Sequence, residues 1–270
     1  MKGWVLLVPS SDSKPVARPG VESYSKVRAN RKTNSFHQLE PYRKQVIAAL
    51  QGALQRGTQL DVLFEATGPA LMEAMRMNQN LEDAPAIPAR DLYDGAMFDS
   101  IGLKSMKSSE IKRFDGSVLM FSGLFGVVRP TDHIPPYRLK FGANLGGSVG
   151  KLLHFWRKPV SEVLRQEVRG KIVWDFLPDQ HKRLWDSTGE FTARHQIKFV
   201  KRVIRSGVAE YKTISHHSKS LKGALIRHLL RRNAHEPSEL HDFKHPDGYR
   251  YDEELSVNKA EDSMLVFAAN

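Results

Sequence analysis

The chain has 270 residues, enough for one large domain or two small ones. It contains no cysteine, which excludes disulfide bonds, thiolate metal sites and cysteine catalysis. Its formal net charge is +11, and this excess predicts a polyanionic partner, nucleic acid first and an anionic membrane surface second, unless the protein is merely basic.

The first apolar segment, residues 5–8, predicts a short buried strand closed by Pro9. It is too short for a signal-peptide core, and no later segment approaches the roughly eighteen apolar residues of a membrane span. We therefore expect a cytoplasmic protein with no membrane partner. The polar turn after the strand holds Ser11, Asp12 and Lys14, which are candidate catalytic residues because active-site loops of α/β proteins often follow strands.

The next part of the chain predicts a loop followed by helices. Residues 15–35 are rich in Pro, Ser, Lys and Arg, which indicates a mobile basic loop. A helix is expected from Pro41 until Gly57 stops it. Two further helices joined by a turn are expected within residues 60–79, and a linker at residues 85–88.

The most informative segment is residues 119–142, where an apolar run ends in a Gly-rich turn that delivers Arg129 and then Arg138. Gly and Pro specify the backbone on both sides of these cations. Fixed guanidinium groups hold phosphate or carboxylate through two-point contacts, although Arg129 could instead tie loops together through carbonyls or a buried Asp. Ser122 is a further catalytic candidate, but it lacks the Gly-x-Ser-x-Gly context and an assignable histidine.

The remaining segments mix helices and strands without strict alternation. We expect helices at residues 107–114, 152–165 and 218–233, and strands at 118–121, 171–176 and 264–267, with paired strands at 197–204 and 208–214. This mixture predicts a single mixed α/β domain over residues 1–270. Nucleotide-binding fingerprints are absent, so no cofactor is expected. Among the eleven histidines, His241 and His245 have the spacing of a helical ligand pair, but Pro246 and Gly248 indicate a turn there, so no metal is expected.

The helix expected at residues 218–233 is basic. Lys219, Gly223 and Arg227 recur every four residues and form one ridge, with leucines on the opposite side and Lys222 nearby. A mid-helix glycine costs about 1 kcal/mol relative to alanine, so Gly223 predicts the close approach of either a ligand or another helix. The cations either line a cleft or are simply solvated.

Residues 122–139, which read SGLFGVVRPTDHIPPYRL, closely resemble the signature of the YaaA family of bacterial peroxide stress proteins. The similarity continues through residues 154–156, the helix near residues 215–227 and the turn at 248–249, and it includes the element at residues 11–14. The resemblance implies a single-domain mixed α/β protein with surrounding helices and a basic cleft, which binds DNA and lowers intracellular iron and oxidative damage under peroxide stress.

The resemblance also implies a helix-hairpin-helix element, which would fall at about residues 60–79. It is degenerate here, because the segment offers one glycine, Gly68, followed by Pro69, which has no N–H for a phosphate.

Two functional hypotheses remain open. The first is a DNA-binding stress protein that takes duplex or distorted DNA, and the second is an enzyme for a small nucleotide-like or carboxylate substrate in the same cleft. Both assume that distant cations converge on one anion-binding cleft, where Tyr137 or Trp156 adds a stacking face. A purely structural role of the motif is a third possibility, and the oligomeric state stays undetermined. The residues assigned to the cleft are Lys14, Arg129, Tyr137, Arg138, Lys219, Lys222 and Arg227.

Overall fold

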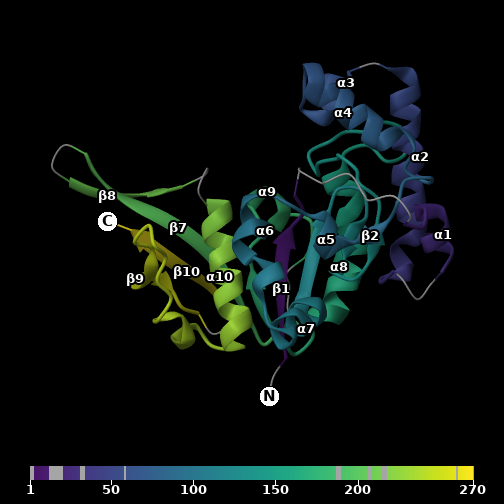
Figure 1. Ribbon diagram of the computed structural model, residues 1–270. Helices are drawn as coiled ribbons and strands as arrows, with labels where there is room; N and C mark the ends of the chain where they lie inside the picture. Colours follow the sequence, from purple (N-terminus) through teal and green to yellow (C-terminus); the bar gives the residue numbers. More distant parts are fainter. Residues whose placement is uncertain are drawn as a thin grey trace.

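The computed structural model describes residues 3–11, 21–30, 34–57, 59–186, 190–205, 208–214, 218–259 and 261–269. Its main feature is an eight-stranded mixed sheet with the strand order β4-β3-β1-β6-β7-β10-β9, in which β8 pairs with β7 (Figure 1). A separate two-stranded sheet joins β2 and β5. The strands are β1 (Trp4–Pro9), β2 (Ile87–Pro88), β3 (Val118–Ser122), β4 (Gly126–Val128), β5 (His133–Ile134), β6 (Ile172–Asp175), β7 (Ala193–Arg205), β8 (Val208–Thr213), β9 (Arg250–Val257) and β10 (Asp262–Ala269).

Helices surround the sheet. They are α1 (Tyr24–Ala29), α2 (Glu40–Arg56), α3 (Leu60–Phe64), α4 (Gly68–Gln79), α5 (Ala89–Leu92), α6 (Ala96–Ile101), α7 (Ser108–Ser117), α8 (Leu152–Val168), α9 (Asp179–Lys182) and α10 (Ser218–Arg232), with short 3-10 turns η1 (His37–Leu39), η2 (Leu103–Ser105) and η3 (Pro237–Leu240). Among the residues listed above as described, no helix has the length and apolar character needed to cross a membrane.

Strand β1 is the centre of the sheet and runs parallel to both of its neighbours, β3 and β6. Its residues from Val5 to Val8 are buried, as expected for a parallel strand covered on both faces. The chain reaches β3 through α7 and β6 through α8, and these two strands lie on opposite sides of β1. Right-handed crossovers therefore place α7 and α8 on opposite faces of the sheet. This architecture confirms the predicted mixed α/β class.

The second half of the chain extends the sheet. Strand β7 is parallel to β6 and β10, and β8 returns antiparallel to β7, which confirms the predicted strand pair at residues 197–204 and 208–214. Helix α10 contacts α6, α7 and β7. The edge strand β9 was not anticipated from the sequence, because its alternation is interrupted by the acidic pair Glu253–Glu254.

One expected loop is partly a helix. Within the predicted mobile segment 15–35, residues 24–29 form α1, and Tyr24 and Val27 are buried in the core. The prediction is therefore wrong for this part, because two apolar residues three positions apart were enough to anchor one helical turn. Residues 12–20 and 31–33 of the region lie outside the described residues. The two helices expected within 60–79 are present as α3 and α4.

Candidate functional site

The carboxyl ends of β1, β3 and β6 lie level at one edge of the sheet, which we call the carboxyl edge. The register sets Pro9 beside Phe121 and Leu7 beside Asp175. The chain leaves β1 toward β3 on one side and leaves β6 toward β7 on the other. Ligands of open α/β sheets bind at such a topological switch point, outside the carboxyl ends of the strands. The carboxyl edge is therefore the first place to examine.

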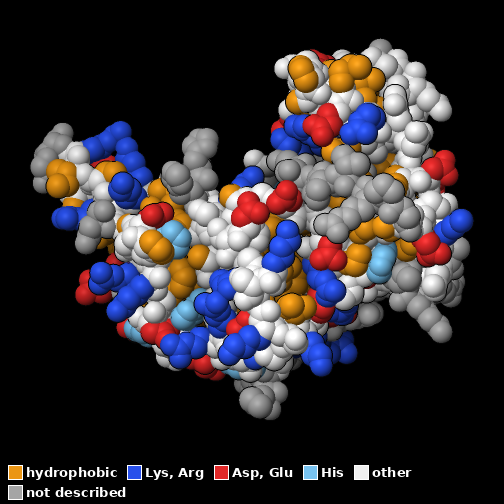
Figure 2. Space-filling view, viewed as in Figure 1, with side chains coloured by type: hydrophobic (Ala, Val, Ile, Leu, Met, Phe, Trp, Pro, Cys, Tyr) orange, Lys and Arg blue, Asp and Glu red, His pale blue; other side chains and the backbone are white. Residues whose placement is uncertain are grey.

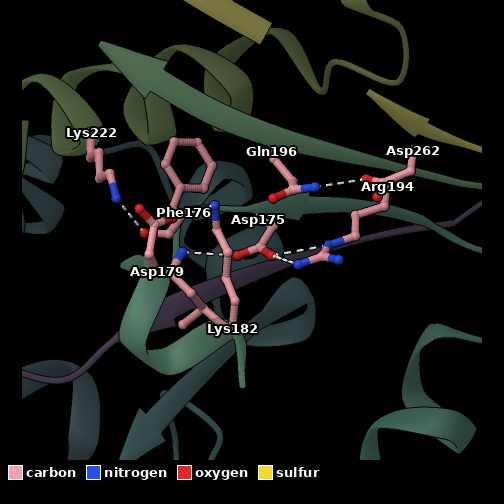
Figure 3. Close-up of polar contacts among 9 residues, drawn as sticks. Asp175, Phe176, Asp179, Lys182, Arg194, Gln196, Lys222 and Asp262 are labelled. Carbon is pink, nitrogen blue, oxygen red and sulfur yellow. Dashed lines mark hydrogen bonds and ion pairs between the residues drawn. The ribbon is translucent and has the colours of Figure 1, made fainter. Parts of the chain in front are cut away.

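A buried ion pair lies at the end of β6 (Figure 3). The Arg194 guanidinium donates to Asp175 Oδ2 from Nη2 at 2.5 Å and from Nε at 3.0 Å, while the Leu177 amide donates to Oδ1 at 2.9 Å. Trp185 covers the guanidinium, whose Cζ lies 5.3 Å from the centroid of the Trp185 ring. Because the carboxylate and its counter-ion satisfy each other, this pair orders the strand end and is not available to a ligand.

Lys222 reaches the same edge from α10. Its Nζ donates to the carbonyl oxygen of Phe176 at 2.7 Å (Figure 3). Burial lowers the pKa of Lys222 from 10.5 to about 8, against the opposing effect of nearby Asp175. A second lysine, Lys182 of α9, pairs with Asp179 at 2.8 Å. The edge thus holds an amine that loses its proton more readily than an ordinary lysine, which suits proton transfer, and that can bind an anion while it is protonated.

The predicted catalytic Ser122 has a structural role in this arrangement. It is fully buried, and its hydroxyl lies 2.7 Å from the hydroxyl of Tyr137 and accepts from the Phe125 amide at 2.9 Å. The Tyr137 hydroxyl also lies 3.0 Å from that of Tyr93. Neither serine nor tyrosine presents a surface to a ligand in this structure.

The predicted stacking faces are likewise buried. Tyr137 and Trp156 are each 0% exposed, and the Trp156 indole donates to the Gly123 carbonyl at 2.9 Å. A base cannot stack on rings that are enclosed by the core. The expectation for these two aromatic residues is therefore wrong, because the sequence marks aromatic residues without showing whether they face the core or the solvent.

Ser11 lies two residues after the end of β1 and accepts a hydrogen bond from the Asp94 amide at 3.0 Å. It lies at the carboxyl edge, as a residue after a parallel strand must. The other two candidates of this turn, Asp12 and Lys14, fall outside the described residues, so their roles stay predictions.

Arg129 lies at the other edge of the sheet. Strand β4 runs antiparallel to β3, with Ser122 beside Gly126 and Met120 beside Val128, so the chain has returned toward the start of β3 when it reaches Arg129. The guanidinium donates to Glu167 of α8 at 2.7 Å and lies over the Phe36 ring at 5.2 Å. The predicted convergence with the cations of α10 is thus not found for Arg129, because hairpin geometry reverses the chain direction.

Arg227 is also occupied by the protein. Its Nη1 donates to the carbonyls of Ile101 and Gly102 at 2.7 and 2.9 Å, and its Nη2 donates to Ser105 Oγ at 2.9 Å. Its neighbour Gly223 faces α6, as Figure 1 shows for the two helices. The ridge of α10 that carries both residues is therefore a helix contact rather than the wall of a ligand cleft.

The two other predicted cations differ in environment. The backbone of Arg138 exchanges hydrogen bonds with the Asn78 side chain of α4, and its buried Nε finds no partner among the described residues. Lys219 is exposed near the start of α10 and forms no salt bridge with any described acidic residue. The structure therefore does not bring together in one cleft the six predicted residues that it describes, and Lys14 lies outside the described residues.

A group of exposed cations without acidic partners among the described residues lies on the hairpin of β7 and β8, which we call the ribbon (residues 200–205 and 208–213). It projects from the body, and Figure 2 shows Lys and Arg gathered on it, with a hollow between it and the corner of α3 and α4. Its one acidic side chain among the described residues is Glu210. Its four cations are exposed and form no salt bridge to a described residue: Lys201, Arg202, Arg205 and Lys212.

The sequence predicted the ribbon as a strand pair but did not single out these cations as a site. Two features of the sequence could have indicated the site. The two strands together carry four cations and one acid, and they have apolar residues on both faces, whereas a half-buried hairpin has them on one face.

Comparison with known proteins gives one family and a set of relatives. Residues 5–255 match the profile of a family described as peroxide stress protein YaaA. The chain is 37% identical over 153 residues to the UPF0246 protein SCO2297 of Streptomyces coelicolor, and the aligned residues cover 57% of this chain and 56% of the relative. It is 30% identical over 184 residues to the UPF0246 protein Mpe_A2092 of Methylibium petroleiphilum, with 67% and 68% covered. The first of these matches thus spans little more than half of the relative's length.

Proposed function

The chain belongs to the family of the peroxide stress protein YaaA, and on that premise we propose that it is a DNA-binding protein of the peroxide stress response. The observation that carries the proposal is the ribbon, with four exposed cations that have no acidic partner among the described residues. Unpaired cations on a projecting element release counter-ions from a nucleic-acid backbone, which gives affinity without sequence preference. Two-stranded ribbons also have the width that a DNA groove accepts.

The charge of the whole chain supports the same partner. A formal charge of +11 attracts polyanions over long distances and speeds their association. Individual cations such as Arg129 and Arg194 are paired with carboxylates of the chain, so the cations without acidic partners define where a polyanion gains most. We therefore assign DNA contact to the ribbon and the adjoining carboxyl edge rather than to the arginines of residues 119–142.

The helix pair α3–α4 contributes less to the proposal. Gly68 has a positive φ of 53° and is followed by Pro69, which offers no amide to a phosphate. The outer surface of the two helices instead exposes Val62 and Met72. Phosphate binding in the manner of a helix-hairpin-helix is not part of the proposal.

A salt titration tests the proposal. Affinity for a short fluorescent duplex is measured by anisotropy at increasing salt for the wild type and for a variant with all four ribbon cations changed to Gln. Each phosphate contact contributes about 0.9 to the slope of log K against log salt, so the variant should lose about 3–4 units of slope. A matched control removes four exposed, unpaired cations around α8, Lys151, Arg157, Lys158 and Arg165, and should change the slope little. Undetectable or salt-insensitive binding by the wild type rejects DNA binding.

A second function is favoured by one observation, the buried amine of Lys222 at the topological switch point. An enzyme for a small anionic substrate would use such an amine to bind the anion or to move a proton. Thermal-shift titration with phosphate and nucleotides, on the wild type and Lys222→Met, separates the two functions. A ligand that stabilises the wild type and not the variant favours the enzyme, and the absence of any shift argues against an enzyme for these ligands.

A further inference from the structure

Within the part of the chain that the structure describes, the outer half of the ribbon pairs with no third strand. Strand β10 pairs with β7 only as far as Lys201, and β6 pairs with it only as far as Gln196. Beyond Lys201, β8 is the one described neighbour of β7, from the pair of Arg202 and Tyr211 to the pair of Arg205 and Val208. Figure 1 shows this part projecting from the sheet. Both faces of the outer ribbon are therefore open to a partner.

The register divides the outer ribbon into two different faces. Residues directly opposite each other in an antiparallel pair share a face, and successive residues alternate. Arg202 pairs with Tyr211, and Ile204 pairs with Ala209, so these four share one face, which we call the tyrosine face. The opposite face holds the pairs Lys201–Lys212, Val203–Glu210 and Arg205–Val208.

The tyrosine face combines exposed apolar surface with positive charge. Tyr211 is 45% exposed and Ile204 is 69% exposed. Apolar side chains that stay in water add little to the stability of a two-stranded ribbon. The one acidic residue of the described ribbon, Glu210, lies on the opposite face. Arg202 lies across from Tyr211, so a ring and a guanidinium are presented together without a competing carboxylate.

The same face continues along β7 toward the body. Lys198 is exposed and lies four residues before Arg202, so their side chains leave the same side of the strand, about 13 Å apart. On the body, Lys198 lies near Asp179, and Asp179 also lies near Lys182 and Lys222 at the carboxyl edge. A row of cations therefore links the tyrosine face to the end of β6.

We propose that the tyrosine face binds an unpaired stretch of nucleic acid, with a base stacked on Tyr211 and the neighbouring phosphates held by Arg202 and Lys198. Stacking on an exposed aromatic ring beside cations is how proteins hold single strands without reading their sequence, because every base has a π face. The bases of an intact duplex are stacked on each other and cannot use the ring. This inference rests on the proposed DNA binding and adds to it the form of DNA that the ribbon selects.

The test compares a fluorescent single strand with the duplex of the same sequence, using the full chain. Tyr211→Ala should weaken binding of the single strand about tenfold or more and should change duplex binding less than about twofold. Tyr211→Phe keeps the ring and should bind like the wild type. Val208→Ala, an exposed apolar position on the opposite face, is the matched control and should also bind like the wild type.

A second measurement reports stacking directly. A single strand that carries 2-aminopurine should lose fluorescence on binding the wild type and Tyr211→Phe, and should keep it with Tyr211→Ala. Because Tyr211 is exposed on the outer ribbon, all variants should melt at the wild-type temperature.

The outcomes separate this inference from the proposed function. If Tyr211→Ala binds the single strand as the wild type does, or weakens single strand and duplex equally, the stacking role is wrong while salt-dependent DNA binding stands. If the wild type binds neither form of DNA, both proposals fall. If Tyr211→Ala converts a wild-type dimer into a monomer, the partner of this face is a second copy of the chain and the inference is overturned.

Discussion

Among the described glycines, Gly223 is the one at which an added Cβ would make the shortest contact with a neighbouring atom. A Cβ at this position would lie 2.2 Å from the Met97 carbonyl oxygen and 2.7 Å from the Ser100 Cβ, both on α6. Such contacts are about 1 Å too short, so α6 and α10 would have to separate by a similar distance. We therefore expect Gly223→Ala to disrupt the packing of the two helices.

Two effects of opposite sign compete in this substitution. Alanine favours a helix interior over glycine by about 1 kcal/mol, which taken alone would stabilise α10. Overpacking of a close contact costs about 1–3 kcal/mol, and a clash with backbone lies at the upper end because a carbonyl cannot rotate away as a long side chain can. The net expectation is a loss of about 2 kcal/mol of unfolding free energy, or about 4–8 °C in Tm.

Thermal and denaturant unfolding of Gly223→Ala measure this loss, with Gly116→Ala as the matched control. Gly116 also lies in a helix, α7, but a Cβ there would meet no atom within 4 Å. The control should gain up to about 1 kcal/mol from helix propensity. If Gly223→Ala is as stable as the wild type or more stable, the close approach of α6 and α10 is not as described, and a ligand becomes the better explanation of this glycine.

Two further predictions concern the cations. Arg129→Ala should lower the free energy of unfolding in denaturant by about 1 kcal/mol, because it removes the part-buried pair with Glu167 and the contact with Phe36. The same variant should bind DNA with unchanged affinity. A loss of affinity like that of the ribbon variant would show that Arg129 belongs to the binding site. Burial sets the pKa of Lys222 at about 8 in the folded protein against 10.5 ordinarily, so between these pH values the unfolded chain binds more protons and stability should rise with pH. The free energy of unfolding of the wild type relative to Lys222→Met should therefore increase from pH 8 to pH 10.5, and a difference that does not vary with pH would show that the amine is not buried in the native state.

Local patterns in the sequence determined most elements of the fold. Apolar runs marked β1 and β6, and alternation marked β7 and β8. Spacing of 3.6 residues marked α10, and the same spacing bounded by Pro41 and Gly57 marked α2. These signals are local, because each depends on which side of a strand or helix neighbouring residues share. The motif at residues 122–139 also pointed to the family that the profile match establishes.

Only the tertiary structure decided which of the marked residues can meet a ligand. Chain reversal at β4 took Arg129 to the edge opposite Lys222, and the core enclosed Ser122, Tyr137 and Trp156. The register of β7 and β8 set Tyr211 beside Arg202 and apart from Glu210. Strand direction, register and burial depend on contacts between residues far apart in the chain, and the composition of a short segment does not contain them.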